Sequence, residues 1–443
     1  MKARLRKLLT QIGESFGLVP GLMVLAGVLL AVFFLELDRT GKLPDWLTES
    51  SWFYNGGGTG ARTLLGAIAS STIGVAGTVF SITIAALSLA AGQMGPRLLR
   101  NFTSDRGVQV TLGAFLGTFS YALVVLRSVR TQDEGPFTPH LALSFGIVLA
   151  FACVATLVYF VGHMASRINV DTVVDLVSSD IQRAMAVTVT EETQSAPPAD
   201  TFWASATLVV DARRGYLQQL DEPGLGDWAA AHGTAIRMLV KRGDYVFPGA
   251  PIAMMTVAVD GADDAIRSAT ALGAHRGSAG DLEYAIRQLV EVGVRALSSG
   301  INDPNTAVSV LNQFGGTLCE LAGKQLPNGV TTREDKVVLV VPNATYQSLV
   351  DGMLHLIRQN AQGSTIVVLR AMDVLTNVLT CEPDLERRAH LVHHADLFWA
   401  DAQRDVANAS DVADIGRRYD FLRRTAAHGA PVVLRTASAS SKP

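Results

Sequence analysis

The sequence is constrained most by an uncharged run of 34 residues, from 63 to 96, between Arg62 and Arg97. As a helix the run would extend about 50 Å, which exceeds the roughly 30 Å hydrocarbon core of a bilayer. It therefore predicts a membrane-spanning helix. Every third or fourth residue in the run is small or carries a hydroxyl, which gives one continuous stripe: Ala67, Ser71, Gly74, Thr78, Ser81, Ala85, Ser88, Gly92 and Gly95.

Two interpretations of this stripe stay open. Small residues let membrane helices approach closely, and hydroxyls can bond across a helix seam or back to the preceding turn, so the stripe can be a packing face. In several copies around an axis it can instead line a wet path, where hydroxyls replace part of an ion's hydration shell. Arg62 and Arg97 at the ends would then favour anions locally. The pore-lining candidates are Ser71, Gly74, Thr78, Ser81 and Ser88.

Three further apolar runs predict membrane spans, at 16–37, 108–126 and 141–161. The third span of the chain contains Gly113 and Gly117, a pair spaced for close helix crossing. Basic residues before the first span place the N-terminus in the cytoplasm, and four spans return the chain there. We therefore predict a multi-pass membrane protein with both termini cytoplasmic.

Composition and motifs give no positive reason to assign several function classes. The net charge of -3 gives no argument for a nucleic-acid partner. Cys153, Cys319 and Cys381 lie far apart, which predicts neither a disulfide framework nor a thiolate metal site. No nucleophile elbow, Walker loop, dinucleotide fingerprint or zinc-protease helix occurs in the sequence. We therefore predict a protein that is not an enzyme and that carries no cofactor.

The chain divides into six expected regions. They are a transmembrane domain of four spans (1–167), an amphipathic stem helix (168–190), a linker (191–200), a small β-module (201–260), a mainly helical cytoplasmic domain (261–430) and a mobile tail (431–443). The apolar face of the stem would be a natural contact surface in a homo-oligomer. The predicted fold class is thus integral membrane α-helical, followed by a cytoplasmic α+β region with a β-sandwich-like module and a helical C-terminal part.

The segment from Gly233 to Ala253 resembles the core of lipoyl- and biotinyl-type β-sandwich modules, in which a strand, a Gly-Asp turn and a second strand recur. Those modules display a modifiable lysine at a hairpin tip, whereas Met254 and Met255 stand after this strand. The resemblance therefore implies a small β-module without a swinging-arm cofactor.

A Gly-rich break and a helix corner form the candidate ligand site of the C-terminal part. Asn302 and Asp303 could bind a polar ligand together with His275 and Arg276, if the Gly-rich break at 273–280 folds beside them. The alternative is a helix corner in which Asp303 caps a helix and Pro304 opens it. The sequence favours the corner.

Three histidines at 390, 393 and 394 lie at metal-ligand spacing on one predicted helix, with Glu386 one turn earlier. The neighbouring Arg387 and Arg388 would repel a cation. We therefore predict a solvated helix face at His390, His393 and His394, and no metal site.

Two stretches together resemble one bacterial family. They are Gly74 to Phe102, which includes the hydroxyl stripe, and Arg295 to Ala307, which includes the Asn302-Asp303-Pro304 turn. Both are similar to signature stretches of the predicted membrane proteins of unknown function grouped as domain of unknown function twenty-two fifty-four. The resemblance implies an integral inner-membrane protein with a cytoplasmic C-terminal region, and it implies no activity.

Two functions remain as hypotheses, and an enzymatic function is kept only as a residual alternative. The first is a homo-oligomeric channel-like or transport protein for small ions, assembled or gated by its cytoplasmic domain. The second is a non-conducting membrane sensor or scaffold whose cytoplasmic domain binds a ligand or partner protein. The lipid bilayer and further copies of the chain are the expected partners.

Overall fold

The computed structural model describes residues 16–40, 57–94, 105–130, 137–167, 170–189, 194–276 and 281–429. The chain separates into a four-helix unit, Thr10–Asn169, and a C-terminal unit that begins at Val170. The predicted tail (431–443) and Arg97 lie outside the described residues, as do residues 191–193 of the predicted linker. The predicted fold class is confirmed, since four long apolar helices precede a mixed α+β region with two sheets and C-terminal helices.

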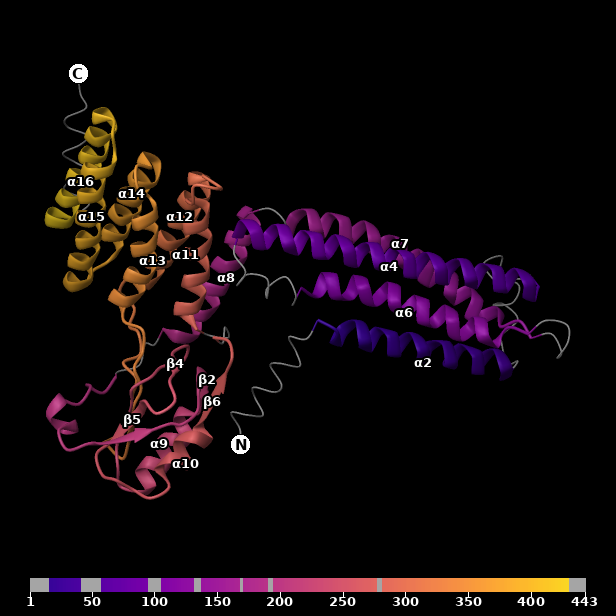
Figure 1. Ribbon diagram of the computed structural model, residues 1–443, viewed down its shortest axis with the longest axis horizontal. Coiled ribbons are helices and arrows are strands. Elements are labelled where there is room, and N and C mark those ends of the chain that lie inside the picture. The colour runs from indigo at the N-terminus through magenta and orange to yellow at the C-terminus, as the bar shows by residue number, and fades with distance from the viewer. Residues whose placement is uncertain are drawn as a thin grey trace. The chain divides into compact units, whose positions relative to one another are not determined.

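The described residues of the first unit form four helices (Figure 1): α2 (Leu18–Thr40), α4 (Gly58–Met94), α6 (Arg106–Ser128) and α7 (His140–Arg167). Each is long and apolar enough to cross a bilayer. Helix α6 is the most enclosed, with 56% of its apolar window buried against 22–28% for the other three. The unit is therefore built around α6.

Glycines allow α2 and α6 to approach closely. A Cβ atom added at Gly27 in α2 would lie 2.3 Å from the carbonyl oxygen of Gly117 in α6. A Cβ atom added at Gly117 would lie 2.8 Å from the carbonyl oxygen of Met23, and Gly113 faces the Met23 side chain. The predicted close crossing at Gly113 and Gly117 is confirmed.

Polar groups join the ends of these helices. Asp38, near the end of α2, accepts two backbone N–H groups from the first turn of α7 at 3.0 and 2.9 Å. The Tyr121 hydroxyl in α6 donates to the Ala142 carbonyl at 2.7 Å. At the start of α6, the capping Asp105 lies 2.9 Å from Nε2 of His163 in α7. The Asp38 contacts satisfy N–H groups of the first turn of α7 that lipid would leave without partners.

The C-terminal unit begins with two sheets and two helices. The larger sheet has the strand order β1-β5-β3-β8-β7, and the smaller has the order β4-β2-β6. The strands are β1 (Thr207–Val210), β2 (Gly215–Leu220), β3 (Ile236–Met238), β4 (Tyr245–Val246), β5 (Pro251–Met255), β6 (Thr270–Gly273), β7 (Val330–Arg333) and β8 (Lys336–Val340). Helices α9 (Glu222–Ala231) and α10 (Ala262–Ala269) lie between strands along the chain, after the short 3-10 helix η2 (Asp200–Trp203).

The larger sheet reaches beyond the predicted β-module. Strand β3 pairs in parallel with β8, whose residues lie far outside 201–260. Parallel neighbours need a long crossover connection, and the chain between β3 and β8 contains α10, α11 (Leu282–Ala296) and α12 (Pro304–Leu321). Met254 and Met255 lie within β5 and pair with Leu208 and Thr207 of β1, so they occupy a sheet position and not a hairpin tip.

One core joins the sheets to α9 and α10. Residues from both sheets, including Leu217, Ile236 and Leu339, are fully buried in it. Burial of each such side chain contributes about 1.5–3 kcal/mol.

Seven helices form the rest of the C-terminal unit: α8 (Val170–Thr188), α11 (Leu282–Ala296), α12 (Pro304–Leu321), α13 (Tyr346–Asn360), α14 (Thr365–Cys381), α15 (Leu385–Asp405) and α16 (Ala409–His428). Helix α8 packs on α11 and α12, which pack on α13 and α14 in turn, and α15 contacts α13, α14 and α16 (Figure 1). Asp281 and Asp303 cap α11 and α12 as predicted.

The apolar face of α8 is occupied within its own chain. Val173, Val174, Val177 and Ile181 are all at most 3% exposed, and α8 packs on α11 and α12. The prediction that this face contacts a second subunit is therefore wrong. An amphipathic face is buried wherever apolar surface of its own chain is available, and α11 and α12 supply that surface.

Candidate functional site

Helix α4 uses one face to pack within the four-helix unit. Its buried residues recur at helical spacing: Leu65, Ile68, Ala69, Thr72, Ala76, Val79, Thr83 and Ala86. This face contacts α6 and α7. The buried hydroxyls of Thr72 and Thr83 donate to carbonyl oxygens of the preceding turn at 2.7 and 2.8 Å. The packing face of α4 is therefore complete without the predicted stripe.

The stripe lies on the other side of α4. At about 100° per residue, its members from Ala67 to Gly92 point away from the buried face, and Gly95 lies outside the described residues. All five pore-lining candidates are exposed in the single chain: Ser71, Gly74, Thr78, Ser81 and Ser88. A Cβ atom added at Gly74 or Gly77 would meet nothing within 4 Å in the described part of the chain. This face is therefore open to lipid, to water or to another copy of the chain.

Hydroxyls on the open face bond to their own helix. Ser71 donates to the Ile68 carbonyl at 3.1 Å, and Ser81 donates to the Gly77 carbonyl at 2.9 Å. Such back-bonding makes a hydroxyl tolerable in a membrane helix. Each oxygen keeps lone pairs that can accept a further bond from water or contact a cation.

The outer faces of α2 and α7 have a different composition. Their exposed residues are mostly large and apolar: Leu22, Leu25, Leu29 and Phe33 in α2, and Val148, Phe151, Val154 and Val158 in α7. Large apolar side chains suit contact with lipid tails. Helix α4 also exposes large side chains such as Phe80, beside the stripe. The small and hydroxyl residues thus form a band along α4.

Of the four residues predicted to bind a polar ligand, two make ion pairs or hydrogen bonds with other residues, and two are exposed. Arg276 lies 3.0 Å from Asp281 and 3.5 Å from Glu283. Asp303 caps α12 and accepts the Thr306 hydroxyl at 2.6 Å. His275 and Asn302 are exposed, and Asn302 has a positive φ of 51°.

No hydrogen bond or ion pair among residues 194–276 and 281–429 joins His275 or Arg276 to Asn302 or Asp303. Residues 277–280 of the Gly-rich break lie outside the described residues. The ligand site at these four residues stays a prediction.

The histidines of α15 do not form a solvated face. His394 is fully buried, His390 is partly buried, and only His393 is exposed. His390 and His394 lie 2.9 and 2.8 Å from Oδ1 of Asp351 in α13. The predicted solvated face is therefore wrong for His394, because α15 packs against neighbouring helices on more than one side.

Burial changes the titration of this cluster. The pKa of His394 is lowered to about 4. Burial is the largest cause, Asp351 opposes it, and the nearby His355 and His390 add smaller lowering effects. The Asp351 carboxyl is also partly buried, which raises its pKa, but its contacts with His394 and His390 outweigh burial and lower the pKa below its usual value. His394 is therefore neutral at pH 7.

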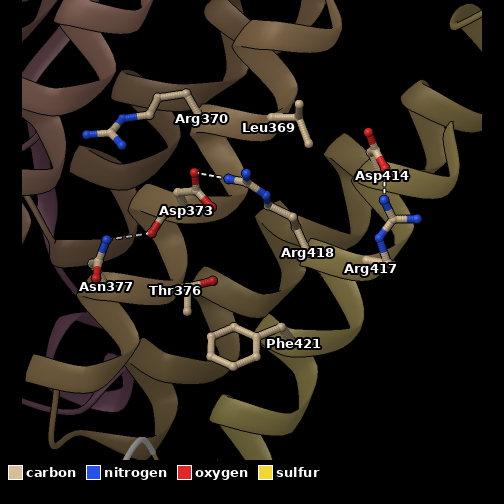
Figure 2. Close-up of a pocket in the computed structure, with 9 residues that line it drawn as sticks. All are labelled: Leu369, Arg370, Asp373, Thr376, Asn377, Asp414, Arg417, Arg418 and Phe421. Carbon is tan, nitrogen blue, oxygen red and sulfur yellow. Dashed lines mark hydrogen bonds and ion pairs between the residues drawn. The ribbon is translucent and has the colours of Figure 1, made fainter. Parts of the chain in front are cut away.

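A surface pocket of about 590 Å³ lies between α14 and α16 (Figure 2). Its lining residues are Leu369, Arg370, Asp373, Thr376, Asn377, Asp414, Arg417, Arg418 and Phe421. Asp373 pairs with Arg418 and Asp414 pairs with Arg417 (Figure 2), and Arg370 donates to Asn312. The charged side chains of the pocket therefore already have protein partners, and we assign no ligand to it.

Sequence reasoning missed Asp351 and His355. They stand at i and i+4 on α13, a spacing that the sequence displays, and their partners stand at i and i+4 on α15. The signal was present on each helix separately. Only the packing of α13 against α15 brings the two pairs together.

Four membrane-length helices followed by an α+β unit define a multi-pass membrane protein with a large C-terminal unit. The chain belongs to the family described as "Predicted membrane protein (DUF2254)", whose model matches residues 13–377. It is 29% identical over 416 residues to the uncharacterized proteins Rv1290c of Mycobacterium tuberculosis and Mb1321c of Mycobacterium bovis, which covers 90% of this chain and 77% of each relative. No solved structure matches the chain. The family resemblance is confirmed, and it names no activity.

Proposed function

We propose that this protein is a homo-oligomeric channel-like or transport protein for small ions, in which copies of α4 surround a shared path. One observation carries the proposal: the small and hydroxyl residues of α4 form an open band on the side opposite its packing face. A band that none of the helices described in its own unit covers is available to line an axis of symmetry.

The proposed path is lined by Ser71, Thr78, Ser81 and Ser88, and Gly74 leaves room for close approach. Hydroxyl oxygens replace part of an ion's hydration shell. No charged residue occurs within 63–96, so selectivity arises from width and hydroxyl density. The exposed Arg62 at the start of α4 favours anions locally.

In this proposal the protein lies in the bacterial inner membrane with both termini in the cytoplasm. The C-terminal unit then assembles or gates the path from the cytoplasmic side. The protein catalyses no reaction and carries no resident cofactor for conduction.

Flux through reconstituted full-length protein tests the proposal. Its native cysteines are first replaced (Cys153→Ala, Cys319→Ser and Cys381→Ser), and Ser81→Cys is then introduced. We expect a membrane-impermeant thiol reagent to reduce ion flux through this variant. The matched control is Phe151→Cys, which places the thiol on the large apolar face of α7. The control should carry flux that the reagent leaves unchanged.

Absence of flux for every small ion tested, under varied voltage and tension, overturns the proposal if the protein remains folded and oligomeric. Equal inhibition of both cysteine variants also overturns it, because the reagent then does not report the α4 band.

The second candidate function is a non-conducting sensor or scaffold. The back-bonded hydroxyls of Ser71 and Ser81 favour it, since they are compatible with a dry packing face. Gly74→Cys separates the candidates. Disulfide cross-linking between copies without any flux supports the scaffold, whereas cross-linking that blocks a measured flux supports the channel.

A further inference from the structure

Three histidine side chains converge on one carboxylate oxygen in the C-terminal unit. Nε2 of His394, His390 and His355 lie 2.8, 2.9 and 3.3 Å from Oδ1 of Asp351. The ligand atoms of Asp351, His390 and His394 all lie within 4.8 Å of one another. Imidazole nitrogen and carboxylate oxygen are the ligands that Zn²⁺ and related divalent ions take in proteins.

The ligand atoms lie close to the separation that a tetrahedral ion requires. Metal–ligand bonds of about 2.0–2.1 Å place tetrahedral ligand atoms about 3.3 Å apart. The Nε2 to Oδ1 distances of His394, His390 and His355 are 2.8, 2.9 and 3.3 Å, and the separations among Asp351, His390 and His394 are at most 4.8 Å. Side-chain shifts of about an ångström would therefore bring these three residues to metal-ligand spacing.

Two helices hold the ligands in register. Asp351 and His355 stand one turn apart on α13, and His390 and His394 stand one turn apart on α15. Residues at i and i+4 project from the same side of a helix. His394 is fully buried, whereas the side chains of Asp351 and His355 are 40% and 41% exposed. The site thus has a rigid inner ligand and a solvent-accessible outer side through which an ion enters.

The two arginines next to the histidines in the sequence donate hydrogen bonds to backbone carbonyls outside the cluster. Arg387 donates to the Leu321 and Lys324 carbonyls. Arg388 donates to carbonyl oxygens at the ends of α14 and α16, including Ala426 at 3.0 Å. The repulsion expected from these arginines is therefore reduced by their commitment to other helix ends.

One buried nitrogen of the histidine cluster has no hydrogen-bond partner in the described residues. Nδ1 of the buried His394 has no hydrogen-bond partner among the residues that the structure describes. The ring is therefore not fixed in one tautomer by a second contact, and its Nε2 lone pair can be directed to a cation while the proton occupies Nδ1.

We propose that Asp351, His390 and His394 bind one divalent transition-metal ion. His355 contacts Asp351 at 3.3 Å but lies outside that group of three, and its half-exposed side chain moves in as the fourth ligand. Zn²⁺ is the ion that a tetrahedral set of three imidazoles and one carboxylate suits. With four protein ligands the site is structural, and the ion ties α13 to α15. The proposal is independent of conduction by α4.

The test uses full-length protein in detergent, stripped of metal by a chelator and dialysed against buffered Zn²⁺. Elemental analysis should find one zinc per chain. His390→Ala and Asp351→Asn should each weaken zinc binding at least about 100-fold, because loss of a ligand exceeds the 10–100-fold effect of losing a supporting contact. The matched control is His393→Ala, since His393 lies on the same helix but is exposed and outside the cluster.

Co²⁺ gives a second readout. It should produce the visible absorption of a tetrahedral site without the thiolate charge-transfer bands that Cys319 or Cys381 would add. His355→Ala alters an exposed side chain and should keep the fold while it changes this spectrum.

Less than one zinc per three chains, or zinc binding by His390→Ala and Asp351→Asn that equals the wild type, overturns the proposal. An octahedral Co²⁺ spectrum in the wild type overturns it even if the ligand variants fail to fold.

Discussion

Replacement of Gly27 by alanine tests the close packing of α2 on α6. The added Cβ atom would lie 2.3 Å from the Gly117 carbonyl oxygen, about 1 Å short of ordinary contact. The obstructing atom belongs to the backbone, so the helices must separate. Overpacking of this kind costs about 1–3 kcal/mol.

The control is Gly21→Ala on the same helix. A Cβ atom at Gly21 meets nothing within 4 Å among the described residues, and the position is exposed. Both substitutions gain helix propensity of up to about 1 kcal/mol. The stability difference between the two variants therefore isolates the steric cost of about 1–3 kcal/mol.

Thermal unfolding in detergent measures this difference. Cys153 is buried in the four-helix unit, so a fluorogenic thiol reagent reports its exposure once Cys319 and Cys381 are replaced by serine. We expect Gly27→Ala to melt below Gly21→Ala by roughly 2–4 °C for each kcal/mol. Equal melting temperatures would show that the α2–α6 seam is wider than described and would refute the reasoning.

Three further outcomes are expected. Ile181→Ala should lower the stability of the C-terminal unit by about 2–5 kcal/mol, measured by denaturant unfolding. The molar mass from light scattering should equal that of the wild type, and a smaller mass would restore the subunit-contact role of α8. Asp38→Ala should destabilise the four-helix unit by about 1–3 kcal/mol for each helix N–H left without an acceptor, measured by the Cys153 assay; an unchanged melt would contradict this. Burial raises the pKa of Asp211, but its contacts with Arg213 outweigh burial and hold the pKa below its usual range. Its contribution to stability is therefore present above about pH 4 and is lost as the pH falls through the folded-state pKa. The difference in the free energy of unfolding between wild type and Asp211→Asn should thus become smaller as the pH falls. A difference that grows in acid would contradict a lowered pKa of Asp211.

Local signals in the sequence predicted much of the fold. Hydropathy located the four membrane-length helices, and capping chemistry located the starts of α11 at Asp281 and α12 at Asp303. These features depend on a few consecutive residues, so one sequence displays them.

Contacts between residues far apart in the sequence could not be predicted from local sequence patterns. The pairing of β3 with β8 joins segments separated by three helices. The burial of His394 and its contact with Asp351 depend on which side of α15 meets α13. A helix that is packed on several sides carries little amphipathic pattern, so α15 gave no signal that distinguishes His394 from His393.

The parallel pairing of β3 with β8 also determines when the larger sheet is completed during synthesis. Roughly 100 residues separate the end of β3 at Met238 from the start of β8 at Lys336. At about 5–20 residues per second, a ribosome needs about 5–20 s to supply the missing neighbour. During that interval one side of β3 is an unprotected edge that can recruit strands of other chains. Nascent chains stalled before residue 336 should therefore depend on a chaperone, whereas chains released after β8 should not.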